Sequence, residues 1–211
     1  PMTISALDIT LYATALFVLF LTPGPVWLAT AARTLAHGAG AALPLILGVA
    51  IGDVLWSLLA ILGLSWVVSA YAGIMVALKW LAVLVFAVMG LLLIRHAARP
   101  IDADSRLNRR GAWAGFIAGL AAILANPKAI LFYMGMLPGF FDLTALTWAD
   151  IAVIATVSMA VPVVGNMGFA LIIDRARLRI TSPDRLRRIN QVAGGLLICV
   201  AGVIALSGVW N

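Results

Sequence analysis

The sequence contains no glutamate and only one cysteine, Cys199, among its 211 residues. A single thiol excludes an internal disulfide and a redox centre built from two thiols. Histidine is almost as scarce, because His37 and His96 are the only two and lie far apart in the chain. No spacing typical of a metal site or of a nucleophile–histidine pair occurs. The sequence therefore predicts no enzyme, no metal site and no bound cofactor.

Charge is also scarce. Charged residues make up 10% of the chain, whereas 64% of it is hydrophobic. A soluble domain carries about 25% charged residues, and several apolar runs here approach or exceed the roughly 20 residues that cross a bilayer. The chain is therefore predicted to be an all-α integral membrane protein. Its net charge of +6 comes from arginines in short loops, which indicates membrane topology and no nucleic-acid partner.

The hydrophobic runs predict six membrane-spanning helices within one membrane domain, residues 1–211. They cover about residues 8–32, 43–64, 72–94, 112–138, 149–173 and 190–209. A polar segment at 95–111, interpreted as a cytoplasmic linker, separates a first three-helix half (8–94) from a second (112–209). A unit of three spans reverses its direction when it is repeated, so two such units would be inverted copies.

The arginines favour one orientation. All twelve fall on one predicted side of the membrane, in the loop after the first span and in the segments 95–111 and 174–188. Lys79 falls on the opposite side, and Lys128 lies within a span. Because positive loops face the cytoplasm, both termini are expected to face outward.

Short paired motifs indicate that the two halves are repeats. LTPGPVW in the first span corresponds to LANPKAI in the fourth. The second and fifth spans each place a polar residue after a glycine, Asp53 in one and Asn166 in the other. The third and sixth spans each carry two small residues eight positions apart. The common order of all three matches favours two inverted three-helix repeats.

Prolines should break the first span at Pro23 and Pro25 and the fourth at Pro127. A proline inside a helix removes a backbone donor and clashes with the preceding turn. Hydrocarbon tolerates such breaks only where the backbone faces protein or a wet cavity. Paired interruptions in two halves point to a transporter's binding site, and the half-helices that follow them would offer free N–H groups to a carboxylate. The alternative is a pair of proline kinks that only shape packing.

Polar residues accompany both breaks. An ionisable residue within a span is costly and usually functional, and Asp53 and Lys128 both lie within predicted spans. Asp53 is interpreted as a group that takes up a proton or binds an ammonium group; a static ion pair with Lys128 is the structural alternative. Asn126 and Asn166 would bond to unwound backbone or to a ligand, or would join helices.

These considerations define a predicted substrate site and no catalytic residues. The site comprises residues of both breaks and the polar side chains near them: Thr22, Pro23, Gly24, Pro25, Asp53, Asn126, Pro127, Lys128, Tyr133 and Asn166. Asp53 is also the predicted proton-coupling group. Glycines spaced four apart, at 48 and 52 and at 111, 115 and 119, predict close helix packing.

At TPGP (22–25), GVAIGD (48–53) and NPKAILFY (126–133), the chain resembles the LysE/RhtB family of amino-acid exporters. The resemblance covers nearly the whole chain. It implies a multi-pass protein of the bacterial inner membrane that exports amino acids or close derivatives, driven by proton antiport. A homodimer is consistent with the resemblance and with the glycine faces.

The expected mechanism is alternating access, in which one inverted repeat moves against the other around a substrate bound at mid-depth. Two other functions stay open from the residues alone. One is export of another small cation or metabolite, and the other is a passive channel.

Overall fold

The computed structural model describes residues 2–21, 24–63, 72–95, 97, 105–178 and 183–206. Regular structure within these ranges is entirely helical, which confirms the all-α prediction for the described part of the chain. The helices, in chain order, are α1 (Ala6–Leu21), α2 (Pro25–His37), α3 (Ala39–Ile61), α5 (Ala72–Arg95), α6 (Ser105–Leu124), α7 (Pro127–Leu131), the π-helix η1 (Phe132–Met136), α8 (Leu137–Phe140), α9 (Trp148–Leu178) and α10 (Pro183–Leu206).

Several of these helices are long and apolar enough to cross a membrane. Three qualify by themselves among the described residues, at 39–61, 148–177 and 187–206. Two bent pairs, α1 with α2 and α6 with the helices after it, raise the number of candidate spans to five. The protein is therefore an integral membrane protein, and the six-span count stays a prediction.

The helices extend further into polar sequence than the hydrophobic runs suggest. α6 begins at Ser105, inside the segment 95–111 that was interpreted as a linker, and α9 continues to Leu178. Arginine has a helix propensity close to that of alanine. The arginine-rich residues at 106–110 and 175–177 therefore prolong an apolar helix instead of ending it.

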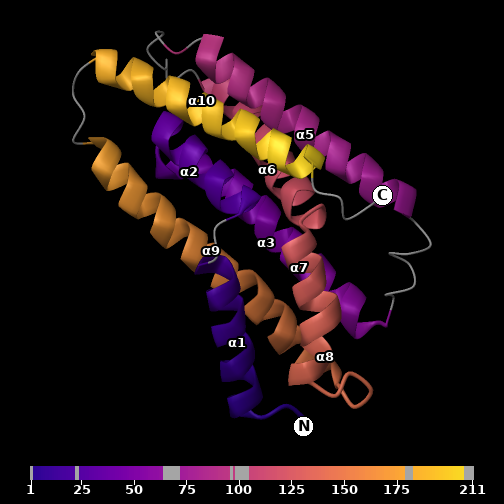
Figure 1. The fold of residues 1–211 in the computed structure, drawn as a ribbon. Helices are drawn as coiled ribbons and strands as arrows, with labels where there is room; N and C mark the ends of the chain where they lie inside the picture. Colours follow the sequence, from indigo (N-terminus) through magenta and orange to yellow (C-terminus); the bar gives the residue numbers. More distant parts are fainter. Residues whose placement is uncertain are drawn as a thin grey trace.

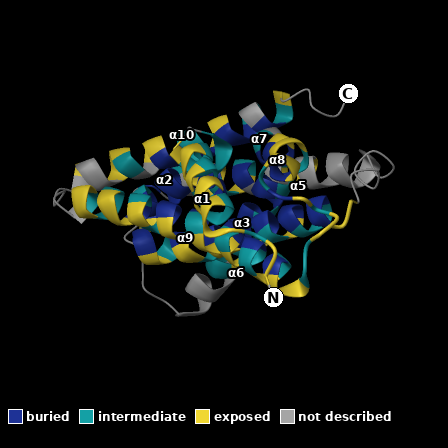
Figure 2. Ribbon diagram, turned by 90° about the horizontal axis from the view of Figure 1, so that it is seen from below, coloured by how far each residue is buried: buried dark blue, intermediate teal, exposed yellow. Residues whose placement is uncertain are grey.

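α3 lies at the centre of the helical bundle. It packs against α2, α6 and α9, while α10 packs against α5 and α2. In Figure 1, α10 and α5 run side by side along one flank, and α1 with α8 lies near the N-terminus. Figure 2 shows buried residues concentrated around α2 and α3, with exposed residues on the outward faces of α9, α1 and α10.

Glycines allow the closest helix contacts, as their spacing predicted. A Cβ on Gly48 of α3 would overlap the carbonyl oxygen of Phe116 in α6, and one on Gly119 of α6 would overlap the Leu45 backbone. A Cβ on Gly90 of α5 would lie 2.6 Å from the Gly194 oxygen of α10. Small residues permit such close approach in membranes, where packing replaces the hydrophobic effect between helices.

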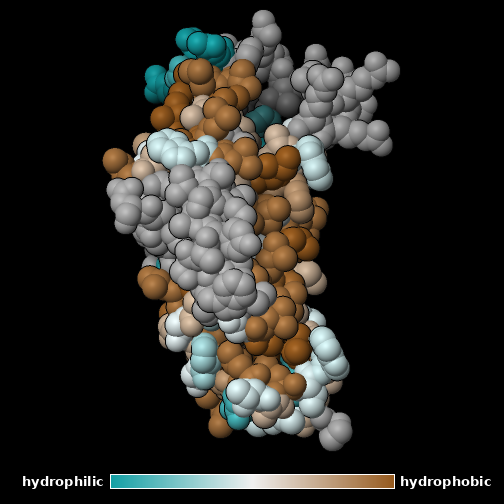
Figure 3. All heavy atoms as spheres, turned by 90° about the vertical axis from the view of Figure 1, so that its right-hand side faces the viewer, coloured by the Kyte–Doolittle hydropathy of each residue, from teal (hydrophilic) through white to brown (hydrophobic). Residues whose placement is uncertain are grey.

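The outer surface is strongly apolar. Large hydrophobic side chains stay exposed along most of the helices, including Leu11, Leu47, Leu84 and Ile172. Figure 3 shows hydrophobic residues over the middle of one face and hydrophilic residues gathered at its two ends. A surface of this kind suits contact with lipid tails between two polar boundaries.

Candidate functional site

The first helix pair is broken between Leu21 and Pro25. The axes of α1 and α2 differ by 63°. Gly24 is the N-cap of α2 in an extended conformation, and no side chain caps this end. Pro25 occupies the first position, where its missing N–H costs nothing. The next amides, at Val26 and Trp27, belong to the turn that has no acceptor within the helix. Thr22 and Pro23, two residues of the predicted site, lie outside the described residues.

The second break separates α6 from α7, and their axes differ by 53°. Asn126 is the N-cap, and its side-chain oxygen accepts a hydrogen bond from the Lys128 amide at 3.1 Å. The prediction that both half-helices begin with free amides is therefore wrong for the Lys128 amide. An asparagine cap satisfies one donor of the first turn, whereas Gly24 in the first break has no side chain with which to do so. The Pro127 side chain lies outside the described residues.

The two breaks meet. Lys128 Nζ donates a hydrogen bond to the Leu19 carbonyl at 2.9 Å, and a Cβ on Gly24 would lie 3.8 Å from the same nitrogen. The sequence explains why this carbonyl accepts the bond. In a continuous helix Leu19 would bond to the amide of residue 23, but that residue is proline and has no N–H.

Two other donors bond to the carbonyl that Pro127 leaves without its usual donor. This carbonyl belongs to Ile123, four residues earlier, and it accepts hydrogen bonds from the Asn126 amide at 3.1 Å and from the indole Nε1 of Trp56 at 3.2 Å. Trp56 lies on α3 and is fully buried. Each break is therefore completed by a side chain from a different part of the fold.

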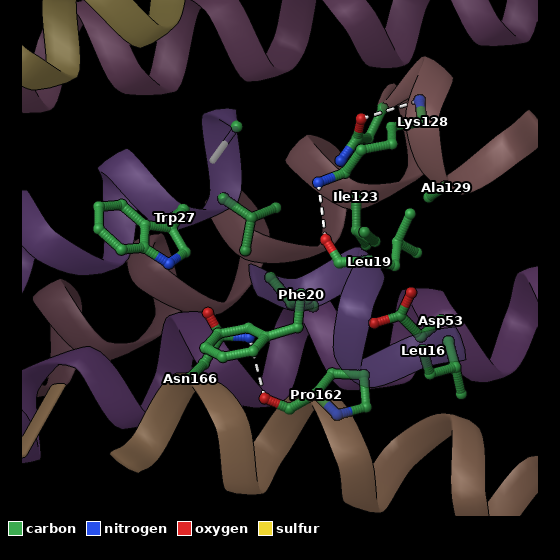
Figure 4. Close-up of a pocket in the computed structure, with 14 residues that line it drawn as sticks. Leu16, Leu19, Phe20, Trp27, Asp53, Ile123, Lys128, Ala129, Pro162 and Asn166 are labelled. Carbon is green, nitrogen blue, oxygen red and sulfur yellow. Dashed lines mark hydrogen bonds between the residues drawn. The ribbon is translucent and has the colours of Figure 1, made fainter. Parts of the chain in front are cut away.

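A pocket lies where the breaks meet (Figure 4). Its polar lining consists of Gly24, Asp53, Asn126, Lys128 and Asn166, all of them predicted site residues. Its apolar lining consists of Leu16, Leu19, Phe20, Val26, Trp27, Val49, Ile123, Ala129 and Pro162. The cavity volume is about 60 Å³, several times the roughly 10–15 Å³ that one water molecule requires. This space suits a molecule of the size of a small amino acid.

The two polar side chains from the central helices are both buried. Asp53 of α3 is 4% exposed and Asn166 of α9 is 3% exposed. Asn166 Nδ2 donates to the Pro162 carbonyl at 2.9 Å, and its Oδ1 accepts from Thr30 of α2 at 3.5 Å. Lys128 reaches the Leu19 carbonyl instead of Asp53 (Figure 4), and the ion pair found among the described residues joins Arg177 to Asp174.

Tyr133 lies beside Asp53 but does not line the pocket. It is fully buried in η1, and its phenol interacts with the Asp53 carboxyl group. No partner meets hydrogen-bond geometry at its hydroxyl within the described part of the chain. A buried hydroxyl in this condition is rare enough to require an explanation.

The sequence analysis missed several residues of the site. Leu16 and Phe20 lie one helical turn apart on α1 and form one wall of the pocket, and Trp27 stacks on Phe169 with ring centroids 3.9 Å apart. Residues 16 and 20 lie four positions apart, and so on one face of the helix, just before the proline break. This spacing could have identified them from the sequence.

Arg33, which the sequence places among the arginines that favour one orientation, lies outside the pocket lining and joins three helices. It is 8% exposed and donates to the carbonyl oxygens of Ala41 in α3 and Gly111 in α6. A Cβ on Gly115 would lie 2.8 Å from its guanidinium carbon, so this glycine leaves space for the arginine.

The described residues contain no group of three or more His, Cys, Asp or Glu side chains arranged to hold a metal ion. The pocket offers hydrogen-bond donors, one carboxylate and one ammonium group. It is equipped to bind a small polar molecule that carries charges of both signs.

These features define an α-helical integral membrane protein with a pocket between two broken helices, lined by apolar side chains and a few polar and charged ones. The sequence model of the LysE type translocators matches residues 17–208, so the chain belongs to that family. The match confirms the resemblance seen in the motifs.

Curated relatives cover most of the chain. An uncharacterized membrane protein of Synechocystis sp. is 32% identical over 173 residues, which is 81% of this chain and 80% of that protein. The homoserine/homoserine lactone efflux protein of Salmonella typhimurium is 24% identical over 188 residues, 89% of this chain and 91% of that protein. No solved structure matches the chain.

Proposed function

We propose that the protein is a secondary active exporter of amino acids or their close derivatives, coupled to proton entry. One observation carries the proposal: both helix breaks open on the same pocket, where Lys128 of one break bonds to the Leu19 carbonyl before the other. Broken helices that face each other around a buried polar pocket are the design of secondary-transporter binding sites.

The lining of the pocket suits a zwitterion. The substrate carboxylate would bind to the uncapped first turn of α2 and to Lys128, because helix N-termini and ammonium groups both attract anions. The substrate ammonium would bind to Asp53 and to the side-chain oxygen of Asn166. A divalent cation would require several carboxylates, and the pocket lining has one.

Membership of the family and the printed name of a relative support the substrate class. The relative in Salmonella typhimurium is named for efflux of homoserine and its lactone. Homoserine is a small amino acid, which fits the size of the pocket. Proton uptake at Asp53 would neutralise the carboxylate and release the ammonium group, which would couple export to the proton gradient.

The packing of the central helices supports an internal repeat and alternating access between its halves. Gly52, just before Asp53, faces Ile123 at the end of α6, and Gly165, just before Asn166, faces Phe20 at the end of α1. Each glycine thus brings a polar residue of one central helix next to the break in the other half. This reciprocal relation is the one that two inverted repeats would produce.

The cellular setting follows from the sequence and belongs to the same proposal. The protein would lie in a bacterial inner membrane with both termini outward, and the arginine-rich end would face the cytoplasm. A homodimer is the expected assembly.

Uptake of a labelled mixture of amino acids, including homoserine, into everted membrane vesicles tests the proposal. Asp53→Asn should abolish uptake driven by the proton gradient. Asp142→Asn is the matched control, because Asp142 is exposed in a loop and bonds only to residues 144 and 145 next to it. Full gradient-driven uptake by Asp53→Asn would show that another group couples the proton.

Counterflow separates a carrier from a channel. Vesicles loaded with unlabelled amino acids should accumulate the labelled ones transiently, because a carrier exchanges substrates across the membrane. A passive channel gives no such overshoot. Thermal unfolding of the purified protein against single amino acids then identifies the substrate, since a ligand that binds only the native state raises its stability.

A further inference from the structure

Three buried hydroxyl groups gather beside Asp53, on the side away from the arginine-rich end. They belong to Tyr12 of α1, Tyr133 of η1 and Ser158 of α9, and each of these residues is 0% exposed. We call them the hydroxyl cluster. None of the three lines the pocket, and binding of a zwitterion does not require them.

The hydroxyl cluster is connected to Asp53. The Tyr12 hydroxyl and Ser158 Oγ lie 2.7 Å apart. Ser158 Oγ also donates to the Ile154 carbonyl of its own helix at 2.7 Å, so Tyr12 is the donor between the two, and this pair must reorient before Ser158 can pass a proton to Tyr12. The Tyr133 phenol interacts with the Asp53 carboxyl group and with both other members of the cluster. No partner meets hydrogen-bond geometry at the Tyr133 hydroxyl among the described residues, so this hydroxyl is free to rotate toward Asp53 or toward the other two hydroxyls.

Local backbone features place these hydroxyls. Tyr133 lies in the π-helix η1, a wider turn that is frequent at functional sites. Pro162 of α9 has no N–H, so the Ser158 carbonyl four residues earlier lacks its usual helical donor. Irregular helix geometry therefore accompanies two of the three hydroxyl groups, those of Tyr133 and Ser158.

The cluster occupies the route from Asp53 to the end of the molecule that carries the N-terminus. Tyr12 lies nearer the start of α1 than the pocket residue Leu16 does, and Ser158 lies nearer the start of α9 than Asn166 does. Aromatic rings surround Tyr12: Phe132 at 6.1 Å, Phe140 at 5.7 Å and Phe141 at 5.2 Å between ring centroids. These rings block an amino acid on this route, whereas a chain of hydroxyls still passes a proton.

We propose that Ser158, Tyr12 and Tyr133 form a proton relay that delivers protons to Asp53 from the end carrying the N-terminus. The relay rests on the proposed function and gives it separate paths for substrate and proton.

Protons and O–H bonds are conserved along the relay. A hydronium ion at that end donates a proton to Ser158 or Tyr12 and becomes water, each hydroxyl passes its own proton to the next, and Tyr133 gives one to the Asp53 carboxylate, which becomes a neutral carboxylic acid. Rotation of the three hydroxyls then restores the chain, so one O–H bond breaks and one forms at every step.

The test compares two assays on the same vesicles with the labelled amino-acid mixture: uptake driven by a proton gradient, and counterflow without a gradient. Tyr12→Phe keeps the ring and its contacts but removes the hydroxyl, and Ser158→Ala removes the other. Each should lower gradient-driven uptake at least tenfold and leave counterflow within twofold. Tyr133→Phe should lower gradient-driven uptake at least as far.

Thr156→Val is the matched control, because Thr156 lies on α9, is exposed, and donates only to its own helix at Ala152. It should leave both assays unchanged. Gradient-driven uptake at the wild-type level in both Tyr12→Phe and Tyr133→Phe would overturn the relay. Equal losses in the two assays would also overturn it, since they would indicate a packing or substrate-binding role. Wild-type protein that is inactive in both assays would instead overturn the proposed function.

Discussion

The two helix breaks arise from the same chemistry but are completed differently. A proline removes the donor for the Leu19 carbonyl in one break and for the Ile123 carbonyl in the other. The first carbonyl is bonded by the ammonium group of Lys128, and the second by the Asn126 amide and the neutral indole of Trp56. Asn126 caps the helix after the second break, whereas Gly24 leaves the helix after the first uncapped.

The difference assigns distinct roles to the breaks. At the second break, the Asn126 side chain caps the helix and the buried Trp56 indole bonds to the Ile123 carbonyl. This break therefore has a structural role. At the first break, no side chain of the described residues caps the first turn of α2, which lies next to a positive charge. A carboxylate should therefore bind to the first break, with the second break supplying Lys128.

The largest expected effect comes from Lys128→Met, which removes the charge shared by the two breaks. A hydrogen bond to a charged group contributes about 1.5 kcal/mol or more, so loss of the bond between the ammonium group and the substrate carboxylate should lower the affinity about tenfold or more. Titration of the thermal shift with the identified amino acid measures this loss. Arg175→Met, which removes an exposed positive charge from α9, should leave the affinity unchanged.

A smaller effect should distinguish the two glycines that face the breaks. In Gly52→Ala the new methyl would overlap Ile123, whose branched side chain is nearly fixed in a helix. In Gly165→Ala it would meet the Phe20 ring at 2.9 Å, and that ring is half-buried and can turn aside. Overpacking costs about 1–3 kcal/mol, so Gly52→Ala should lower the melting temperature more.

Gly135→Ala controls for this comparison, because no atom lies within 4 Å of the site where its Cβ would be. Equal melting temperatures for Gly52→Ala and Gly165→Ala would contradict this prediction, because they would show that both sites tolerate the added methyl group equally well.

The smallest effects should follow from exchanging the caps. Gly24→Asn fits the extended backbone (φ −168°) and would cap α2, so a ligand carboxylate must displace a bond worth about 1 kcal/mol. The affinity should fall about fivefold. Asn126→Gly should lower stability by only a few tenths of a kcal/mol and leave the affinity within twofold. Isothermal titration of both variants measures the contrast, and an unchanged affinity in Gly24→Asn would remove the α2 amides from the site.

The sequence predicted the membrane class, both breaks and most of the polar lining, because proline chemistry and charged residues in apolar runs have few interpretations. The periodicity of the sequence does not predict which side chain bonds to a carbonyl that has lost its helical donor. The roles of Lys128 and Trp56 are therefore visible only in the folded structure. The pairing could have been anticipated in part: proline at 23 and 127 identifies the carbonyls of Leu19 and Ile123 as acceptors without donors. Tyr12 and Ser158 gave no signal, since single hydroxyls in a span usually bond to their own helix.

Arg33 constrains how the molecule can move. Its guanidinium holds the starts of α3 and α6 to the end of α2, so these three helices cannot separate at the arginine-rich end without breaking both bonds. The acceptors are main-chain oxygens, which side-chain replacement cannot remove and which water readily satisfies once they are released. These two hydrogen bonds can therefore break and form again. The rate at which they break sets an upper limit on the rate of any transport cycle that separates the three helices at this end.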